Sequence, residues 1–96
     1  AGGDGIRIER IISAGQSTPE GFFYDQDEDE WVAVLQGSAE VAFYSGSALT
    51  EKFVLQSGDT LFIPAHCRHR VLKTSSHPPC IWLCIFGRDM SWKTNP

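Results

Sequence analysis

The chain has 96 residues and a mass of 10.6 kDa, with 42% hydrophobic and 21% charged residues, which fits one small globular domain and excludes a disordered or collagen-like chain. Its formal net charge is -4 and its eight Lys and Arg residues are dispersed, so we expect no nucleic-acid partner. The longest apolar stretches, such as residues 81–86, are far shorter than the ~20 residues of a membrane span, so we expect no membrane partner.

Taken in chain order, the sequence predicts a series of short strands. Apolar and polar residues alternate in several segments, which is the period of a half-buried strand, and no segment repeats apolar residues at helix spacing. Glycine-containing turn signals at 45–47 and 57–59 separate some of the segments. The pattern predicts an all-β sandwich or closed barrel. The predicted strands cover residues 5–12, 22–24, 31–35, 39–44, 49–56, 60–63, 68–71 and 81–86.

A single domain is expected to fill the chain. It would span residues 1–96, with a core over about 5–87 and a C-terminal tail over 88–96. In that tail, Met90 and Trp92 could pack back on the barrel. Residues 31–35 are apolar on both faces, which indicates a strand covered on both sides and is consistent with a second subunit.

The three cysteines are too few, and odd in number, for a disulfide framework. We therefore expect Cys67, Cys80 and Cys84 to be reduced thiols in a cytoplasmic protein. Because Cys80, Trp82 and Cys84 fall on one face of the last predicted strand, we expect them in the core or in a dimer interface.

The first group of residues that carries a functional signal lies around an acidic run. Glu30 is followed by six residues and then Gly37, while Tyr24 and Gln26 precede Glu30 at a spacing of two residues from each other. This segment resembles the first motif of the cupin superfamily of small jelly-roll barrels. Tyr24 and Gln26 stand where that family has two histidines.

The second group lies after the middle of the chain. Gly58, Pro64 and His69 match the second cupin motif in register, in a stretch that reads Leu-Gln-Ser-Gly-Asp-Thr-Leu-Phe-Ile-Pro-Ala-His. His66 stands where the family has a second glycine, and Lys73 stands where it has an asparagine. The two motifs together span residues 21–73.

The resemblance implies an all-β fold of the cupin type, a jelly-roll β-barrel built as an antiparallel double sheet. In metal-bearing cupins the motif positions supply three imidazoles and one carboxylate, a set that suits a divalent Fe, Mn, Ni, Cu or Zn ion. Dimers are common among small cupins, so a homodimer is also expected.

The expected pocket residues are Tyr24, Gln26, Glu30 and His69. Residues two apart on a strand point to the same face, so Tyr24 and Gln26 share one, and His69 enters from a distant strand. The candidate metal ligands are Glu30, His69 and His66, which would form a set of two histidines and one carboxylate if the loop carrying His66 turned inward. Without His66 only two ligands remain, whereas catalytic zinc sites use three protein ligands.

Each of these residues also has a structural interpretation. Glu30 could pair with an arginine, and His69 could be a neutral core histidine bonded to the backbone. Tyr24 and Gln26 could fill the space that two imidazoles would occupy, or they could hydrogen-bond a small polar ligand.

Three functional hypotheses follow. The leading one is a cupin of unassigned activity that binds a small molecule in the barrel pocket and has a degraded metal site. The alternatives are a metal-dependent enzyme of dioxygenase, isomerase or lyase type, and a non-catalytic dimeric structural module. Substrate and catalytic residues are not fixed by the sequence, because one fold hosts many chemistries.

Overall fold

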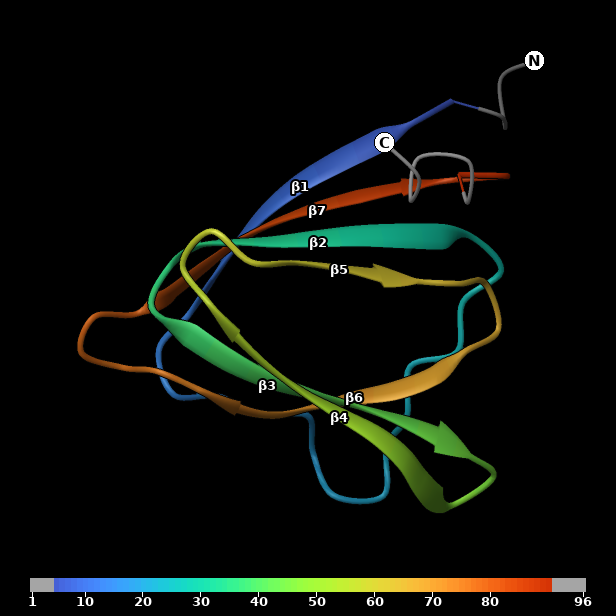
Figure 1. The fold of residues 1–96 in the computed structure, drawn as a ribbon, viewed down its shortest axis with the longest axis horizontal. Helices are drawn as coiled ribbons and strands as arrows, with labels where there is room; N and C mark the ends of the chain where they lie inside the picture. The colour runs from blue at the N-terminus through green and yellow to red at the C-terminus, as the bar shows by residue number, and fades with distance from the viewer. Residues whose placement is uncertain (1–4, 91–96) are drawn as a thin grey trace.

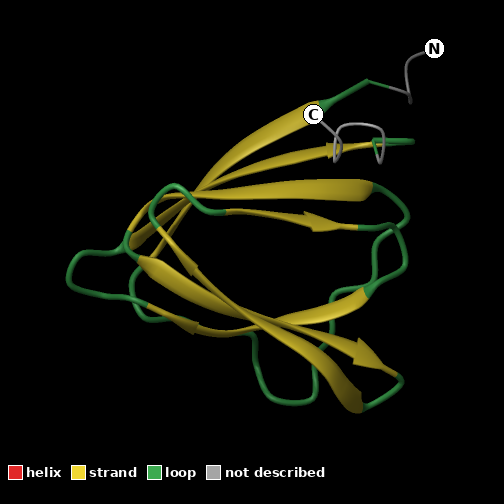
Figure 2. Cartoon of the chain, in the orientation of Figure 1, coloured by secondary structure: helices red, strands yellow, loops and turns green. Residues whose placement is uncertain are grey.

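The computed structural model describes residues 5–90 (Figure 1). This part of the chain is all-β and includes no helix able to cross a membrane (Figure 2). The predicted fold class is confirmed. The strands are β1 (Arg7–Ser13), β2 (Asp29–Gln36), β3 (Ser38–Ser45), β4 (Ala48–Gln56), β5 (Thr60–Ile63), β6 (Arg68–Thr74) and β7 (Cys80–Gly87).

Two antiparallel sheets form the two layers of the molecule. Sheet A has four strands in the order β1-β7-β2-β5, and sheet B has three in the order β4-β3-β6. The sheets lie face to face, with the loops gathered at the two ends (Figure 1). This is the expected antiparallel double sheet of a jelly roll, although the named strands of one layer form no ladder with those of the other in residues 5–90.

The core fills the space between the sheets. Burial alternates along β7, as a strand with one face toward the core requires, and Cys80, Trp82 and Cys84 all lie on the buried face. They belong to the core, and all three cysteines of the chain are free thiols. The buried core residues are Val32, Val34, Ala39, Val41, Leu55, Leu61, Ile63, Cys80, Trp82, Cys84 and Phe86.

The predicted strand over 22–24 is not formed. Only Tyr24 pairs, through an isolated bridge in which its backbone exchanges hydrogen bonds of 2.9 and 3.0 Å with that of His69. Phe22 is half exposed, and Phe23 packs edge-on against Tyr44. The aromatic run therefore lies as a loop along β6 rather than adding a full strand to sheet B.

The end of the described chain packs on sheet A. Met90 is 2% exposed, as expected for a tail that returns to the barrel, and Trp92 lies outside the described residues. Asp29, at the start of β2, accepts a hydrogen bond of 2.9 Å from the Met90 backbone N–H and one of 2.8 Å from that of Ala65. One carboxylate thus holds three segments together at one end of the barrel.

Candidate functional site

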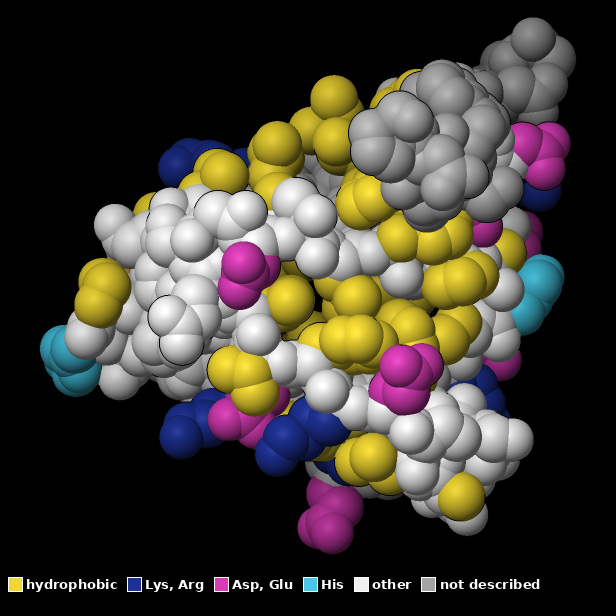
Figure 3. All heavy atoms as spheres, in the orientation of Figure 1, with side chains coloured by type: hydrophobic (Ala, Val, Ile, Leu, Met, Phe, Trp, Pro, Cys, Tyr) yellow, Lys and Arg dark blue, Asp and Glu magenta, His cyan; other side chains and the backbone are white. Residues whose placement is uncertain are grey.

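A pocket of about 400 Å³ opens between the two sheets. This volume lies in the range of small-molecule sites, roughly 300–1,000 Å³. Apolar side chains gather between the layers on the face shown in Figure 3. Side chains of β1 and of residues 16–19 give the pocket a polar rim, and β1 is largely exposed, so the pocket reaches solvent along that strand. Its apolar walls include Ile11, Val32, Val41, Ile63, Val71 and Trp82.

The polar centre of the pocket is a pair of side chains from opposite layers. Glu30 projects from β2 of sheet A, and His69 projects from β6 of sheet B. Both are buried, at 7% and 5% exposure, and His69 Nε2 lies 3.9 Å from Glu30 Oε1. The structure therefore brings together two residues that are far apart in the sequence.

Burial sets the protonation of Glu30. Loss of water raises the pKa of its carboxyl from an ordinary value of 4.5 to about 7, and the hydrogen bond with the Cys84 thiol, which lowers the pKa, offsets only part of this rise. The nearby cation Arg7 gives little relief, because its guanidinium lies over the Phe86 ring at 4.2 Å. Phe86 stands between Arg7 and Glu30 in the sheet register.

A backbone contact fixes the tautomer of His69. Its Nδ1 lies 2.9 Å from the Cys67 carbonyl oxygen, which can only accept, so Nδ1 carries the hydrogen. Burial lowers the pKa of the imidazole, and the Cys67 contact only partly offsets this. In the neutral ring, Nε2 is consequently a free acceptor that faces Glu30.

Tyr24 and Gln26 both line the pocket beside this pair. The Tyr24 ring stacks on the His69 ring with centroids 5.4 Å apart and planes 24° apart. The Gln26 backbone oxygen accepts a hydrogen bond of 2.6 Å from the His66 N–H, which ties the loop before β2 to the loop before β6. The four expected pocket residues are therefore neighbours.

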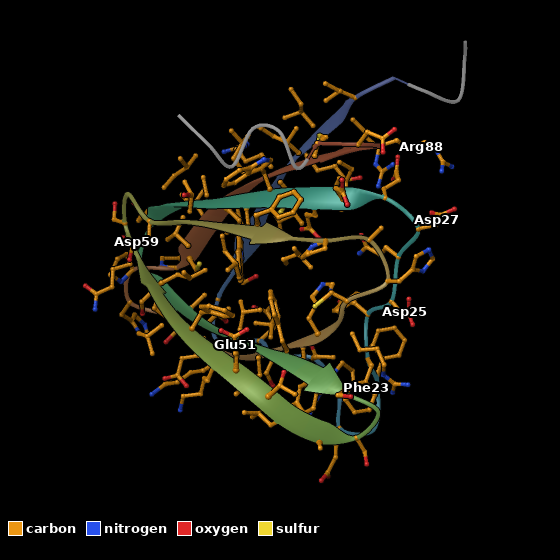
Figure 4. The ribbon with its side chains drawn as sticks, turned by 45° about the vertical axis from the view of Figure 1, so that its right-hand side comes forward. Phe23, Asp25, Asp27, Glu51, Asp59 and Arg88 are labelled. Atoms are coloured by element: carbon orange, nitrogen blue, oxygen red, sulfur yellow. The ribbon has the colours of Figure 1, made fainter. Side chains whose placement is uncertain are left out.

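His66 does not join them. Its φ of 63° is in the left-handed region that favours glycine, and its side chain is 71% exposed. His66 Nδ1 lies 3.5 Å from Asp25 Oδ1, on the outer surface of the loop end where Figure 4 labels Asp25 and Asp27. The inward turn needed for a third metal ligand is not observed, because this turn conformation directs the imidazole to solvent.

The donors present do not fit a transition-metal ion. Within residues 5–90 no group of three or more His, Cys, Asp or Glu side chains is placed to hold one. Glu30 and His69 remain two donors, whereas catalytic zinc sites use three protein ligands. A neutral amide and a phenol, the side chains of Gln26 and Tyr24, are poor ligands for divalent transition metals near neutral pH.

Several lining residues were not expected from the sequence. β1 contributes Arg7, Glu9 and Ser13 to the rim, and the Trp82 indole donates a hydrogen bond of 3.1 Å to the Ser13 hydroxyl. Alternation along residues 5–12 shows which side chains share a face. It does not show which face turns to the pocket, because that depends on the pairing of β1 with β7.

Comparison with known proteins agrees with the fold. The family model described as a cupin domain matches residues 9–86 of the chain. No curated protein matches it. A solved structure from Ralstonia eutropha, provisionally assigned as a mannose-6-phosphate isomerase, shares 46% identity and superposes with a TM-score of 0.77, covering 88% of this chain and 75% of that one.

Two further solved structures share the architecture at lower identity. A cupin superfamily protein from Desulfitobacterium hafniense is 24% identical, with a TM-score of 0.69 and coverage of 88% of this chain and 68% of that one. The DMSP lyase DddQ from Ruegeria pomeroyi is 21% identical, with a TM-score of 0.70, and the match spans 92% of this chain but 41% of the lyase. These two likenesses show the fold alone. With a family model that matches most of its length, the chain belongs to the cupin superfamily.

Proposed function

We propose that this cupin binds a small organic molecule in the pocket between its sheets, with Glu30 and His69 as the polar contacts. The supporting observation is that the two groups face each other at 3.9 Å, which is too long for a hydrogen bond between them. His69 Nε2 is not among the buried side-chain atoms of residues 5–90 that lack a partner, so it is accessible from the pocket that His69 lines. A ligand in the pocket can therefore hydrogen-bond this atom.

A proton-transfer enzyme is the second candidate. The carboxyl of Glu30 has a pKa near 7, which suits a general acid or base at neutral pH. The relative at 46% identity carries a provisional isomerase assignment, and isomerisation of a sugar moves protons. A metal-dependent reaction is less well supported by this chain, because within residues 5–90 no third His, Cys, Asp or Glu side chain is placed to hold a metal ion together with Glu30 and His69.

A thermal-shift screen followed by NMR titration tests the binding proposal. We expect ligands that raise the melting temperature of the wild-type chain and shift the amide signals of Val32, Val71 and Cys84, which line the pocket. The substitutions Gln26→Ala and His69→Gln should each lower the affinity for these ligands by about tenfold, which corresponds to the loss of one hydrogen bond. The exposed substitution Glu20→Ala serves as the control and should leave binding unchanged.

Two other outcomes separate the alternatives. Elemental analysis of protein purified without chelator would favour the metal-dependent enzyme if it found about one transition-metal ion per chain that both Glu30→Ala and His69→Ala remove. If a broad ligand set gives no stabilisation and no pocket shifts, the binding proposal is wrong and the structural module is favoured.

A further inference from the structure

The spacing of the central pair suits one particular chemical group. Glu30 is buried, and the nearby cation Arg7 is already paired with Glu9 and Glu28, so burial favours the neutral, protonated form of Glu30, which donates a hydrogen bond. His69 Nε2 is an acceptor, because the ring hydrogen is on Nδ1. With Oε1 and Nε2 3.9 Å apart, a single oxygen about 2.8 Å from each atom would bridge them.

That oxygen has to accept from Glu30 and donate to His69 at the same time. A hydroxyl group does both. A carboxylate or a fully ionised phosphate has no hydrogen to donate, so it would leave Nε2 without a partner or face it with a lone pair. The pair therefore discriminates in favour of an alcohol.

The charges around the pocket also favour an uncharged ligand over an anion. Among its lining residues, all within the described chain, Arg7 is the one Lys or Arg. Its Nε lies 2.9 Å from Glu9 Oε2 and its Nη1 lies 3.0 Å from Glu28 Oε1. Two carboxylates thus already neutralise this cation, and the described lining holds no unpaired positive charge that would attract an anion.

From this geometry we infer that the pocket selects an uncharged molecule whose hydroxyl group bridges Glu30 and His69, and that it rejects phosphate esters. This inference rests on the proposed binding function and specifies its ligand class. It also separates the chain from the activity named for its relative, since mannose 6-phosphate is a phosphate ester and this pocket offers no unpaired cation to receive it.

Matched ligand pairs test the inference. Each pair consists of an uncharged sugar or alcohol and its phosphate monoester, with mannose and mannose 6-phosphate as one pair. Titrations of the whole chain are followed by the amide signals of Val32, Val71 and Cys84. We expect the uncharged member of the binding pairs to bind at least about tenfold more tightly than its phosphate ester.

A variant with fewer acidic side chains near Arg7 is expected to gain affinity for phosphate esters. Glu9→Gln combined with Glu28→Gln removes both carboxylate partners of Arg7 and should raise affinity for the phosphate member several-fold, so that the preference for the uncharged member narrows. Glu9 lines the pocket, and the Glu28 side chain is half-buried beside Arg7, so the melting temperature of the variant is compared with that of the wild type. Glu20→Gln, an exposed residue outside the pocket lining, is the matched control and should alter neither affinity.

The contrary outcomes are distinguishable. If the phosphate member binds as tightly as its partner or more tightly, and Arg7→Gln weakens it, the inference is overturned while the small-molecule proposal stands. If no pair shifts the pocket signals, the inference is also overturned, and the broader thermal-shift screen decides separately whether the proposed function survives.

Discussion

At the scale of single residues, Glu30 couples the pocket to the stability of the fold. Its pKa is about 7 in the folded chain against 4.5 as an ordinary value, so the folded state holds this proton more tightly than the unfolded state does. The stability it contributes is complete below about pH 4.5 and is lost as the pH rises through 7. Removing the titrating group with Glu30→Gln should abolish this loss.

The expected gain for Glu30→Gln over the wild type is up to ~3 kcal/mol at alkaline pH and much less near pH ~5. Urea unfolding at both pH values measures it. His69 titrates in the opposite sense, because burial lowers its pKa, and its histidine is present in both proteins. Equal pH dependence in the variant and the wild type would mean that Glu30 is solvated or paired. Glu20→Gln, an exposed carboxyl, is the control.

The sequence predicted the positions of some site residues and not of others. The spacing of Glu30 and His69 in the two motifs predicted pocket positions, and the structure places both there. The position of His66 depends on one backbone angle, a φ of 63°, and the signal for it was that His66 stands where the family motif has a glycine. The sequence did not predict that Arg7 lies at the pocket rim, because that position follows from the pairing of β1 with β7.

At the scale of elements, Asp29 joins the start of β2 to the loop before β6 and to the segment after β7. Asp29 is 9% exposed, and its carboxylate accepts hydrogen bonds from the backbone N–H groups of Ala65 and Met90. Asp29→Ala would leave both donors without a partner, so we expect a loss of about 3 kcal/mol in the free energy of unfolding. Urea unfolding followed by tryptophan fluorescence measures it.

Asp27 supplies the matched control for Asp29. It lies in the same acidic run, but its carboxylate is exposed and sits 3.7 Å from Arg88 (Figure 4). Such a surface pair contributes less than ~1 kcal/mol, so Asp27→Ala should be nearly neutral. Similar losses for the two variants would show that general charge in the run, rather than the two buried hydrogen bonds of Asp29, holds this end together.

The strands themselves were largely predictable, and the exceptions have a physical cause. Alternation identified the segments of β1, β3 and β4, and the apolar run at 81–86 identified that of β7. The aromatic run at 22–24 has strand-forming side chains, but only Tyr24 finds a pairing partner, in His69. A strand forms only where a neighbouring backbone is available for pairing, and the residue types of the segment do not show whether one is.

At the scale of the whole molecule, the two faces of sheet A differ from those of an ordinary sandwich. The inner face covers the core, yet the outer face is also apolar. One row of paired residues crosses all four strands with no polar side chain except the Trp31 indole: Ile8, Ile85, Trp31 and Phe62. Leu35 and Ile12, on the same sheet, are 51% and 55% exposed. Apolar patches of this kind mark contact surfaces.

The expected homodimer can be tested on this outer face. A second copy would present the same apolar row, so two copies could pack face to face about a two-fold axis. We expect light scattering to give a mass of twice 10.6 kDa for the wild type and 10.6 kDa for Leu83→Glu, which puts a charge beside that row. Val54→Glu, on a 56% exposed residue of β4 in sheet B, should leave the mass unchanged. A wild-type monomer, or dissociation by Val54→Glu instead, would contradict a dimer through sheet A.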